Sequence, residues 1–132
     1  MIVADASFIV EFLLNAADSP RVANLVAGED VLAAPVLLDY EVMSALRRQV
    51  FTKEISNTRA QAALLALGDL SIDRHAIEPF VDRIWSLRQN LTVYDASYVA
   101  LAEHLAVPLH TLDARLAAAP GHGARIVVMW GG

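Results

Sequence analysis

Four acidic side chains of this sequence have surroundings that could support catalysis: Asp5, Glu41, Asp95 and Asp113. Clustered carboxylates repel one another, so such a cluster is tolerated only when cations or shared protons reduce its charge. Mg²⁺ and Mn²⁺ prefer hard oxygen ligands and usually bind through a few carboxylates together with phosphate oxygens. Because such an ion can polarise a phosphate and lower the pKa of a bound water, these acids predict metal-dependent phosphate chemistry.

Asp5 and Asp113 each follow a short apolar segment and precede the expected start of a helix. The carboxyl ends of strands in an open parallel sheet form the edge at which binding sites are found. We therefore expect both carboxylates at one such edge. The alternative for each is that the aspartate only caps its helix.

Glu41 lies inside a predicted long helix, three residues after Leu38 and four before Ala45. Residues at this spacing are neighbours on a helix surface, so Glu41 borders an apolar stripe of Leu38, Val42, Ala45 and Leu46. A carboxylate at that margin loses hydration unless it is paired. The alternative to a functional role is a salt bridge to a nearby arginine such as Arg48.

Asp95 lies in the first turn of another predicted helix and shares a face with Val99 and Ala102. The positive end of the helix dipole favours an ionised carboxylate, so Asp95 could keep its charge while it faces the interior. A metal ligand requires this combination. Capping of the helix is again the alternative.

The elements that must position these acids alternate between short apolar strands and helices. This order predicts an α/β domain of three layers, α/β/α, around a parallel sheet of about five strands. We expect the last strand to be buried on both faces, because its residues are almost all β-branched or apolar. The predicted strands are residues 1–4, 31–34, 70–73, 107–111 and 125–129, and the predicted helices are residues 7–15, 20–27, 35–51, 57–67, 76–88, 94–106 and 114–119.

Length and composition predict one domain over residues 1–132, without a membrane span. No uninterrupted apolar stretch approaches the roughly 20 residues that cross a bilayer. Residues 1–14 contain two acidic and no basic residues, unlike an export signal. We therefore expect a cytoplasmic protein. The absence of cysteine excludes disulfides, thiolate metal sites and a cysteine nucleophile.

The charge and apolar content of the chain bear on its partners. With a formal net charge of −5, the protein needs local arginines or bound cations to approach phosphates. Hydrophobic residues make up 56% of the chain, which favours burial of some apolar surface in a partner or in a second copy.

Four segments together resemble the PIN-domain ribonucleases, and within them the VapC toxins of toxin–antitoxin pairs. Residues 2–8 look like the opening strand of the family, with its aspartate followed by a hydroxyl residue, and residues 38–47 look like its glutamate helix. Residues 94–103 and 107–113 look like its closing pair of motifs. The resemblance covers essentially the whole chain, and the order and spacing of the segments make it specific.

The resemblance implies an endoribonuclease that depends on Mg²⁺ or Mn²⁺, forms a homodimer and is inhibited by a cognate VapB-like antitoxin. It also implies that the four acids bind metal. Ser7 and Thr111 would be supporting hydroxyls, which bind metal-bound water or orient a carboxylate.

Other functions remain open or fail on particular residues. A non-catalytic interaction module of the same fold and a related DNA nuclease are both compatible with the sequence. A phosphoacceptor receiver domain and a haloacid-dehalogenase-type phosphatase each need a lysine near the site, and the only lysine is Lys53, in mid-chain. Arg47 and Arg48 could contact RNA or simply solvate their helix.

Overall fold

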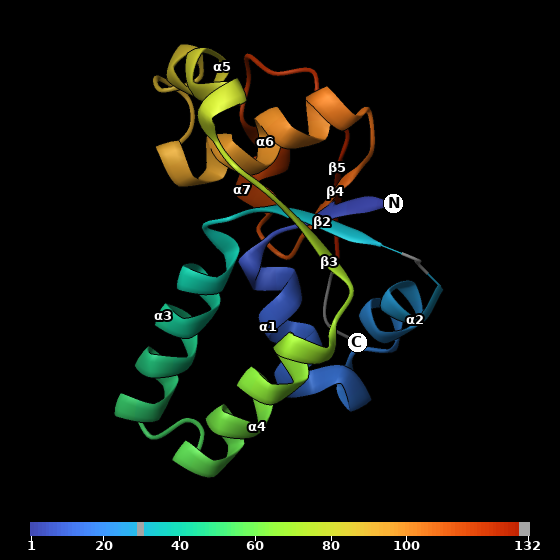
Figure 1. The fold of residues 1–132 in the computed structure, drawn as a ribbon, viewed down its shortest axis with the longest axis vertical. Helices are drawn as coiled ribbons and strands as arrows, with labels where there is room; N and C mark the ends of the chain where they lie inside the picture. Colours follow the sequence, from blue (N-terminus) through green and yellow to red (C-terminus); the bar gives the residue numbers. More distant parts are fainter. Residues whose placement is uncertain (29–30, 130–132) are drawn as a thin grey trace.

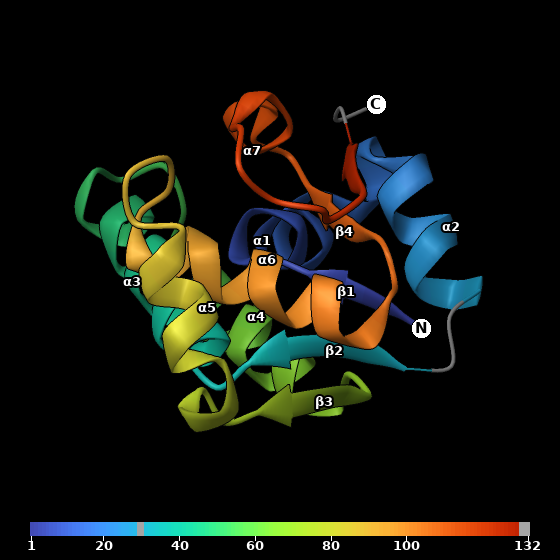
Figure 2. The same ribbon diagram turned by 90° about the horizontal axis from the view of Figure 1, so that it is seen from above.

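A parallel β-sheet forms the centre of the computed structural model, which describes residues 1–28 and 31–129 (Figure 1). The strands lie in the order β3-β2-β1-β4-β5, and each neighbouring pair is parallel. Figure 2 shows this order from β3 through β2 and β1 to β4. The strands are β1 (Ile2–Ala4), β2 (Leu32–Pro35), β3 (Ile72–His75), β4 (Leu109–Thr111) and β5 (Ile126–Val128).

Helices cover both faces of the sheet, which confirms the predicted three-layer α/β/α architecture. On one side α1, α3 and α4 pack together with α2 beside α1, and on the other side lie α5 and α6 (Figure 1). Within the described residues, no helix has the length and apolar character that crossing a membrane requires. The helices are α1 (Ala6–Asn15), α2 (Pro20–Gly28), α3 (Leu38–Phe51), α4 (Asn57–Asp69), α5 (Val81–Ser86), α6 (Val93–Leu105) and α7 (Ala114–Ala118).

The core lies on both sides of the central strand β1, whose three residues are all buried. Helix α6 contacts β1, β2 and β4, and residues 96–102 of this helix are buried without interruption. On the opposite side, α3 buries Leu38, Val42 and Leu46. These are members of the apolar stripe predicted beside Glu41, so the face of α3 that carries the glutamate is directed as expected.

Pro35 marks a place where the sequence prediction was wrong. It was expected to start the long helix, but it is the last residue of β2, and α3 begins at Leu38. The next residue, Val36, donates its N–H to the carbonyl of His75 at 2.9 Å. This bond continues the pairing with β3, and a proline at a strand end does not interrupt it because its own N–H is not needed there.

Two further predictions needed correction. The helix expected over residues 76–88 is interrupted, since a 3₁₀ turn (Glu78–Phe80) precedes the short α5. The last strand, expected to be buried on both faces, is only half-buried. It lies at the edge of the sheet beside β4, where one side lacks a neighbouring strand, and its apolar composition did not reveal that position.

An ion pair joins the two helices of one layer. Arg83 on α5 donates from Nε to Glu103 Oε1 and from Nη2 to Glu103 Oε2 of α6, both at 2.8 Å. The Gly123 N–H also donates to Glu103, at 2.7 Å. These contacts lower the pKa of the Glu103 carboxyl below its ordinary value of 4.5, and the hydrogen bonds from Arg83 contribute most. The charged form of Glu103 is therefore favoured in the folded protein.

We predict that Glu103→Gln lowers the free energy of unfolding at pH 7 by about 1 kcal/mol, because Arg83 is partly exposed and the pair is partly screened. A lowered folded-state pKa stabilises the fold above the unfolded pKa, and this stabilisation is lost as pH falls through the folded pKa. Urea unfolding at a series of pH values should therefore show the difference between variant and wild type shrinking below pH 4.5. The exposed Glu78→Gln serves as the control, and an equal loss in both variants would contradict the prediction.

Candidate active site

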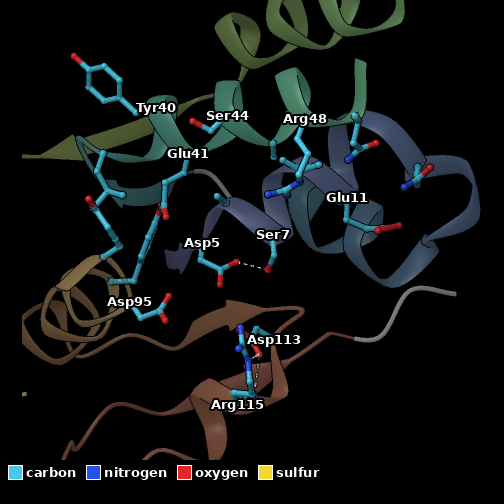
Figure 3. A pocket seen from close by; sticks show the side chains of 18 residues that line it. Asp5, Ser7, Glu11, Tyr40, Glu41, Ser44, Arg48, Asp95, Asp113 and Arg115 are labelled. Carbon is cyan, nitrogen blue, oxygen red and sulfur yellow. Dashed lines mark hydrogen bonds and ion pairs between the residues drawn. The ribbon is translucent and has the colours of Figure 1, made fainter. Parts of the chain in front are cut away.

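A pocket of about 950 Å³ opens beside the carboxyl ends of β1 and β4, and all four acids predicted from the sequence line it (Figure 3). Asp5 directly follows β1, and Asp113 lies two residues beyond β4. Glu41 comes from α3 and Asp95 from the first turn of α6. We call this cavity the acidic pocket. Its position agrees with the expected location of sites in parallel sheets.

The carboxylate of Asp5 is buried at the base of the acidic pocket. Its Oδ1 accepts hydrogen bonds from Ser7 Oγ at 2.7 Å and from the Phe8 N–H at 3.1 Å, and its Oδ2 accepts one from Thr111 Oγ1. Burial raises the pKa of the Asp5 carboxyl, although these hydrogen bonds act in the opposite direction. Asp5 thus both caps α1 and lines the pocket, so helix capping and a functional role do not exclude each other.

Ser7 and Thr111, expected as supporting hydroxyls, lie where they orient a carboxylate. Both donate to Asp5, and their two oxygens are 3.3 Å apart. The Leu112 N–H donates to Ser7 Oγ and the Asp113 N–H to Thr111 Oγ1, each at 3.0 Å. The hydroxyls therefore connect the start of α1 to the loop after β4.

Glu41 is half-buried and is held by a residue that the sequence prediction missed. The hydroxyl of Tyr98 donates to Glu41 Oε1 at 2.6 Å. No ion pair joins Glu41 to Arg48 within the described residues, so that alternative was wrong. Burial raises the pKa of the Glu41 carboxyl, the hydrogen bond from Tyr98 lowers it, and the charges of Asp95 and Asp5 raise it again. Tyr98 itself is only 1% exposed.

Asp95 is not the cap of its helix. Thr92 is the N-cap of α6, and its Oγ1 accepts the Asp95 N–H at 3.1 Å. Figure 3 shows the carboxylate of Asp95 beside those of Asp5 and Glu41, and after burial its charge also raises the pKa values of both acids. The carboxylates of Asp5, Glu41 and Asp95 therefore form one electrostatically coupled group.

Asp113 lies across the pocket and is engaged by Arg115. Its carboxylate caps α7 by accepting the Arg115 N–H at 3.0 Å. The guanidinium of Arg115 also donates to both carboxylate oxygens, from Nε at 3.0 Å and from Nη2 at 2.8 Å. These bonds lower the pKa of the Asp113 carboxyl. Asp113 thus differs from the other three acids because a cation of the chain itself already pairs with it.

The oxygen donors of the acidic pocket fit a hard divalent cation in chemical type. Burial and, to a smaller extent, the charge of Asp95 disfavour the charged forms of Asp5 and Glu41, and a cation would offset both effects. In residues 1–28 and 31–129, however, no three acidic or imidazole side chains stand close enough together to form a ready metal cluster. A metal site formed by all four acids therefore stays a prediction.

The residues that the sequence prediction missed lie at simple spacings from those that it found. Tyr98 follows Asp95 by three residues on α6 and so shares its face, and Arg115 follows Asp113 by two. The apolar neighbours of Tyr98 gave no reason to separate it from ordinary core aromatics.

The sequence and the fold were compared with known proteins. The family model described as PIN domain matches residues 2–121. The chain belongs to the PIN-domain family. Two relatives from Mycobacterium tuberculosis (strain ATCC 25618 / H37Rv) are Ribonuclease VapC1 and Ribonuclease VapC12. The first is 48% identical over 120 residues, 90% of each chain, and the second is 42% identical over 126 residues, 96% of this chain and 97% of the other. These identities place the chain in the VapC group of the family, which confirms the resemblance seen in the sequence.

Solved structures support the PIN fold. PAE2754 from Pyrobaculum aerophilum superposes with a TM-score of 0.72 at 22% identity, over 95% of this chain and 81% of the other. Mycobacterium tuberculosis VapC20, described as a sarcin-ricin loop cleaving toxin, superposes with a TM-score of 0.67 at 17% identity, over 89% of this chain and 94% of the other. At these identities the likeness concerns the fold alone.

We predict that Tyr98→Phe lowers the free energy of unfolding by about 1–2 kcal/mol, because a half-buried carboxylate loses its donor. Urea unfolding monitored by circular dichroism measures the change. Tyr94→Phe is the matched control, since Tyr94 lies on the same helix and is 63% exposed. If the two variants were equally stable, the bond to Glu41 would contribute nothing to the fold.

Proposed function

We propose that this PIN-domain chain is an endoribonuclease that hydrolyses phosphodiester bonds of RNA with the help of Mg²⁺ or Mn²⁺. The proposal rests on one observation: Asp5, Glu41 and Asp95 line one pocket, and Asp113 lies on its far wall. The chain is also 48% identical to Ribonuclease VapC1. The four acids are the proposed metal ligands.

The side chains of the acidic pocket would hold and orient the reacting groups. Ser7 and Thr111 fix the Asp5 carboxylate, and Tyr98 fixes that of Glu41, so these oxygens have little freedom to rotate away. Such preorganisation removes the cost of ordering the ligands when substrate binds. When bound, the divalent ion would neutralise the carboxylates, polarise the phosphate and lower the pKa of a water.

The formal charge of the chain favours a bound cation for this substrate. A net charge of −5 and the coupled carboxylates would repel a polyanion such as RNA. Of the residues lining the pocket, only Arg48 and Arg115 are basic, and Arg115 is paired with Asp113. Divalent ions therefore supply most of the positive charge that the phosphate meets in the proposed mechanism.

We further propose that the chain is the toxin of a toxin–antitoxin pair, that a VapB-like antitoxin inhibits it, and that it acts in the cytoplasm as a homodimer. The names of its relatives and the description of VapC20 as a toxin support the first part. Several large apolar side chains are exposed and could be covered by either partner. They include Tyr40 at 73%, Phe51 at 67%, Leu65 at 75% and Trp85 at 61%.

We predict that Asp95→Asn lowers metal-dependent RNA cleavage by more than about 100-fold, because even residues that only orient metal ligands cost roughly 10- to 100-fold. Asp5→Asn should act similarly. Cleavage of a fluorescent RNA is measured with MnCl₂, with MgCl₂ and with EDTA, and circular dichroism checks the fold. The exposed Asp69→Asn is the control. Undiminished cleavage by both pocket variants, or full activity in EDTA, would contradict the metal-dependent mechanism.

The two alternatives that the sequence left open are separated by the same assay. A DNA oligonucleotide of the same sequence, cleaved as fast as the RNA, would indicate a nuclease without ribose specificity. A non-catalytic module would cleave neither polymer, and isothermal titration with MnCl₂ would show no binding to it.

We predict that expression of the chain alone arrests bacterial growth and that Asp95→Asn abolishes the arrest, since the same carboxylate would serve cleavage and toxicity. Growth curves after induction measure this, with immunoblots to confirm equal amounts of protein. Co-expression of the gene next to it, if that gene encodes a VapB-like protein, should restore growth. Equal growth with the wild type and with Asp95→Asn would argue against a toxin.

A further inference from the structure

The acidic pocket extends beyond the carboxylates, between α1 and α3. On α3 its lining continues from Glu41 through Ser44 to Arg48, and on α1 it continues from Ser7 to Asn15. Glu41 and Arg48 are seven residues apart, so they share one face of α3 and lie roughly 10 Å apart along its axis. One continuous cavity therefore has acids at one end and an arginine at the other.

Arg47 and Arg48 are adjacent in sequence but have different environments. The guanidinium carbon of Arg47 lies 4.4 Å from the ring centre of Phe51, and Arg47 does not line the pocket. The side chain of Arg48 extends from α3 into the pocket (Figure 3). The structure thus separates two residues that the sequence left equivalent.

The guanidinium of Arg48 forms no hydrogen bond or ion pair within the described part of the chain, although its backbone carbonyl accepts the Thr52 N–H. The other basic residue of the pocket, Arg115, is held by Asp113. One acid, Glu11, also lines this end, and its Oε1 accepts a hydrogen bond from the buried Ser19 at 2.8 Å. Within the described residues, no ion pair joins Glu11 to Arg48. Arg48 is therefore available to an anion that enters the pocket.

We propose that this end of the pocket is a phosphate-binding subsite for the RNA strand, with Arg48 contacting a backbone phosphate. This inference rests on the proposed function. The roughly 10 Å between Glu41 and Arg48 along α3 is enough for Arg48 to meet a different phosphate from the one beside the acids. The neutral polar side chains of Ser44, Gln49 and Asn15 also line the pocket and could bond to sugar or base.

RNA fits this subsite better than an acidic peptide does. The subsite is continuous with the carboxylates at which the scissile phosphate would lie, so one strand could reach both the acids and Arg48 without leaving the pocket. The planar guanidinium also matches two phosphate oxygens at once. A contact at this point would offset part of the repulsion between the strand and the acids.

The test compares Arg48→Ala with Arg47→Ala, which removes the same charge from the same helix outside the pocket. Binding of a fluorescent single-stranded RNA of mixed sequence is measured by anisotropy in EDTA over a range of NaCl concentrations. We expect Arg48→Ala to weaken binding about fivefold at low salt and to reduce the slope of log K against log [NaCl] by about 0.7 in magnitude, the value for one phosphate contact on a single strand. Arg47→Ala should match the wild type, and Arg48→Lys should keep the slope. Thermal unfolding checks that both alanine variants fold.

The outcomes distinguish failure of the proposed subsite from failure of the proposed ribonuclease function. If the wild type cleaves RNA with MnCl₂ but Arg48→Ala and Arg47→Ala bind RNA alike, the subsite is wrong while the ribonuclease stands. In that case Arg48 serves a protein contact or none. If the wild type neither binds nor cleaves RNA under any of these conditions, the proposed function itself fails and the subsite fails with it.

Discussion

Burying a carboxylate costs hydration free energy unless hydrogen bonds and nearby charge compensate it, and Asp5 is buried where β1, β4 and α1 meet. Three donors satisfy it: the hydroxyls of Ser7 and Thr111 and the N–H of Phe8. Ser7 and Phe8 belong to the first turns of α1, and Thr111 is the last residue of β4. The same bonds that keep Asp5 in place therefore fix where the helix leaves the central strand and where the neighbouring strand ends.

The other acids are arranged around this buried carboxylate, and a different group stabilises the negative charge of each. Glu41 has the hydroxyl of Tyr98, Asp113 has the guanidinium of Arg115, and Asp95 lies in the first turn of α6, where the helix dipole favours its charge. Despite these partners, burial and, to a smaller extent, the charge of Asp95 still raise the pKa values of the Asp5 and Glu41 carboxyls. The groups of the chain thus stabilise the negative charge of the acids only in part, and a bound cation is the simplest group that would do the rest.

Much of this arrangement could be predicted from the sequence, because parallel strands bring residues that follow them to one edge. That rule placed Asp5 and Asp113 together across more than a hundred residues, and the apolar stripe of α3 directed Glu41 inward. Contacts between distant side chains could not be predicted in this way. The bond from Tyr98 to Glu41 depends on how two helices pack, the half-burial of β5 depends on strand order, and the difference between Arg47 and Arg48 depends on which helix lies opposite.

The coupled carboxylates of Asp5, Glu41 and Asp95 also affect the stability of the fold. Their repulsion exists only in the folded chain, where Asp5, Glu41 and Asp95 are brought together, so it weakens the native state relative to the unfolded one. Neutral residues of similar shape would remove this repulsion. The chain therefore holds this repulsion at some expense of stability, as sites adapted to chemistry commonly do.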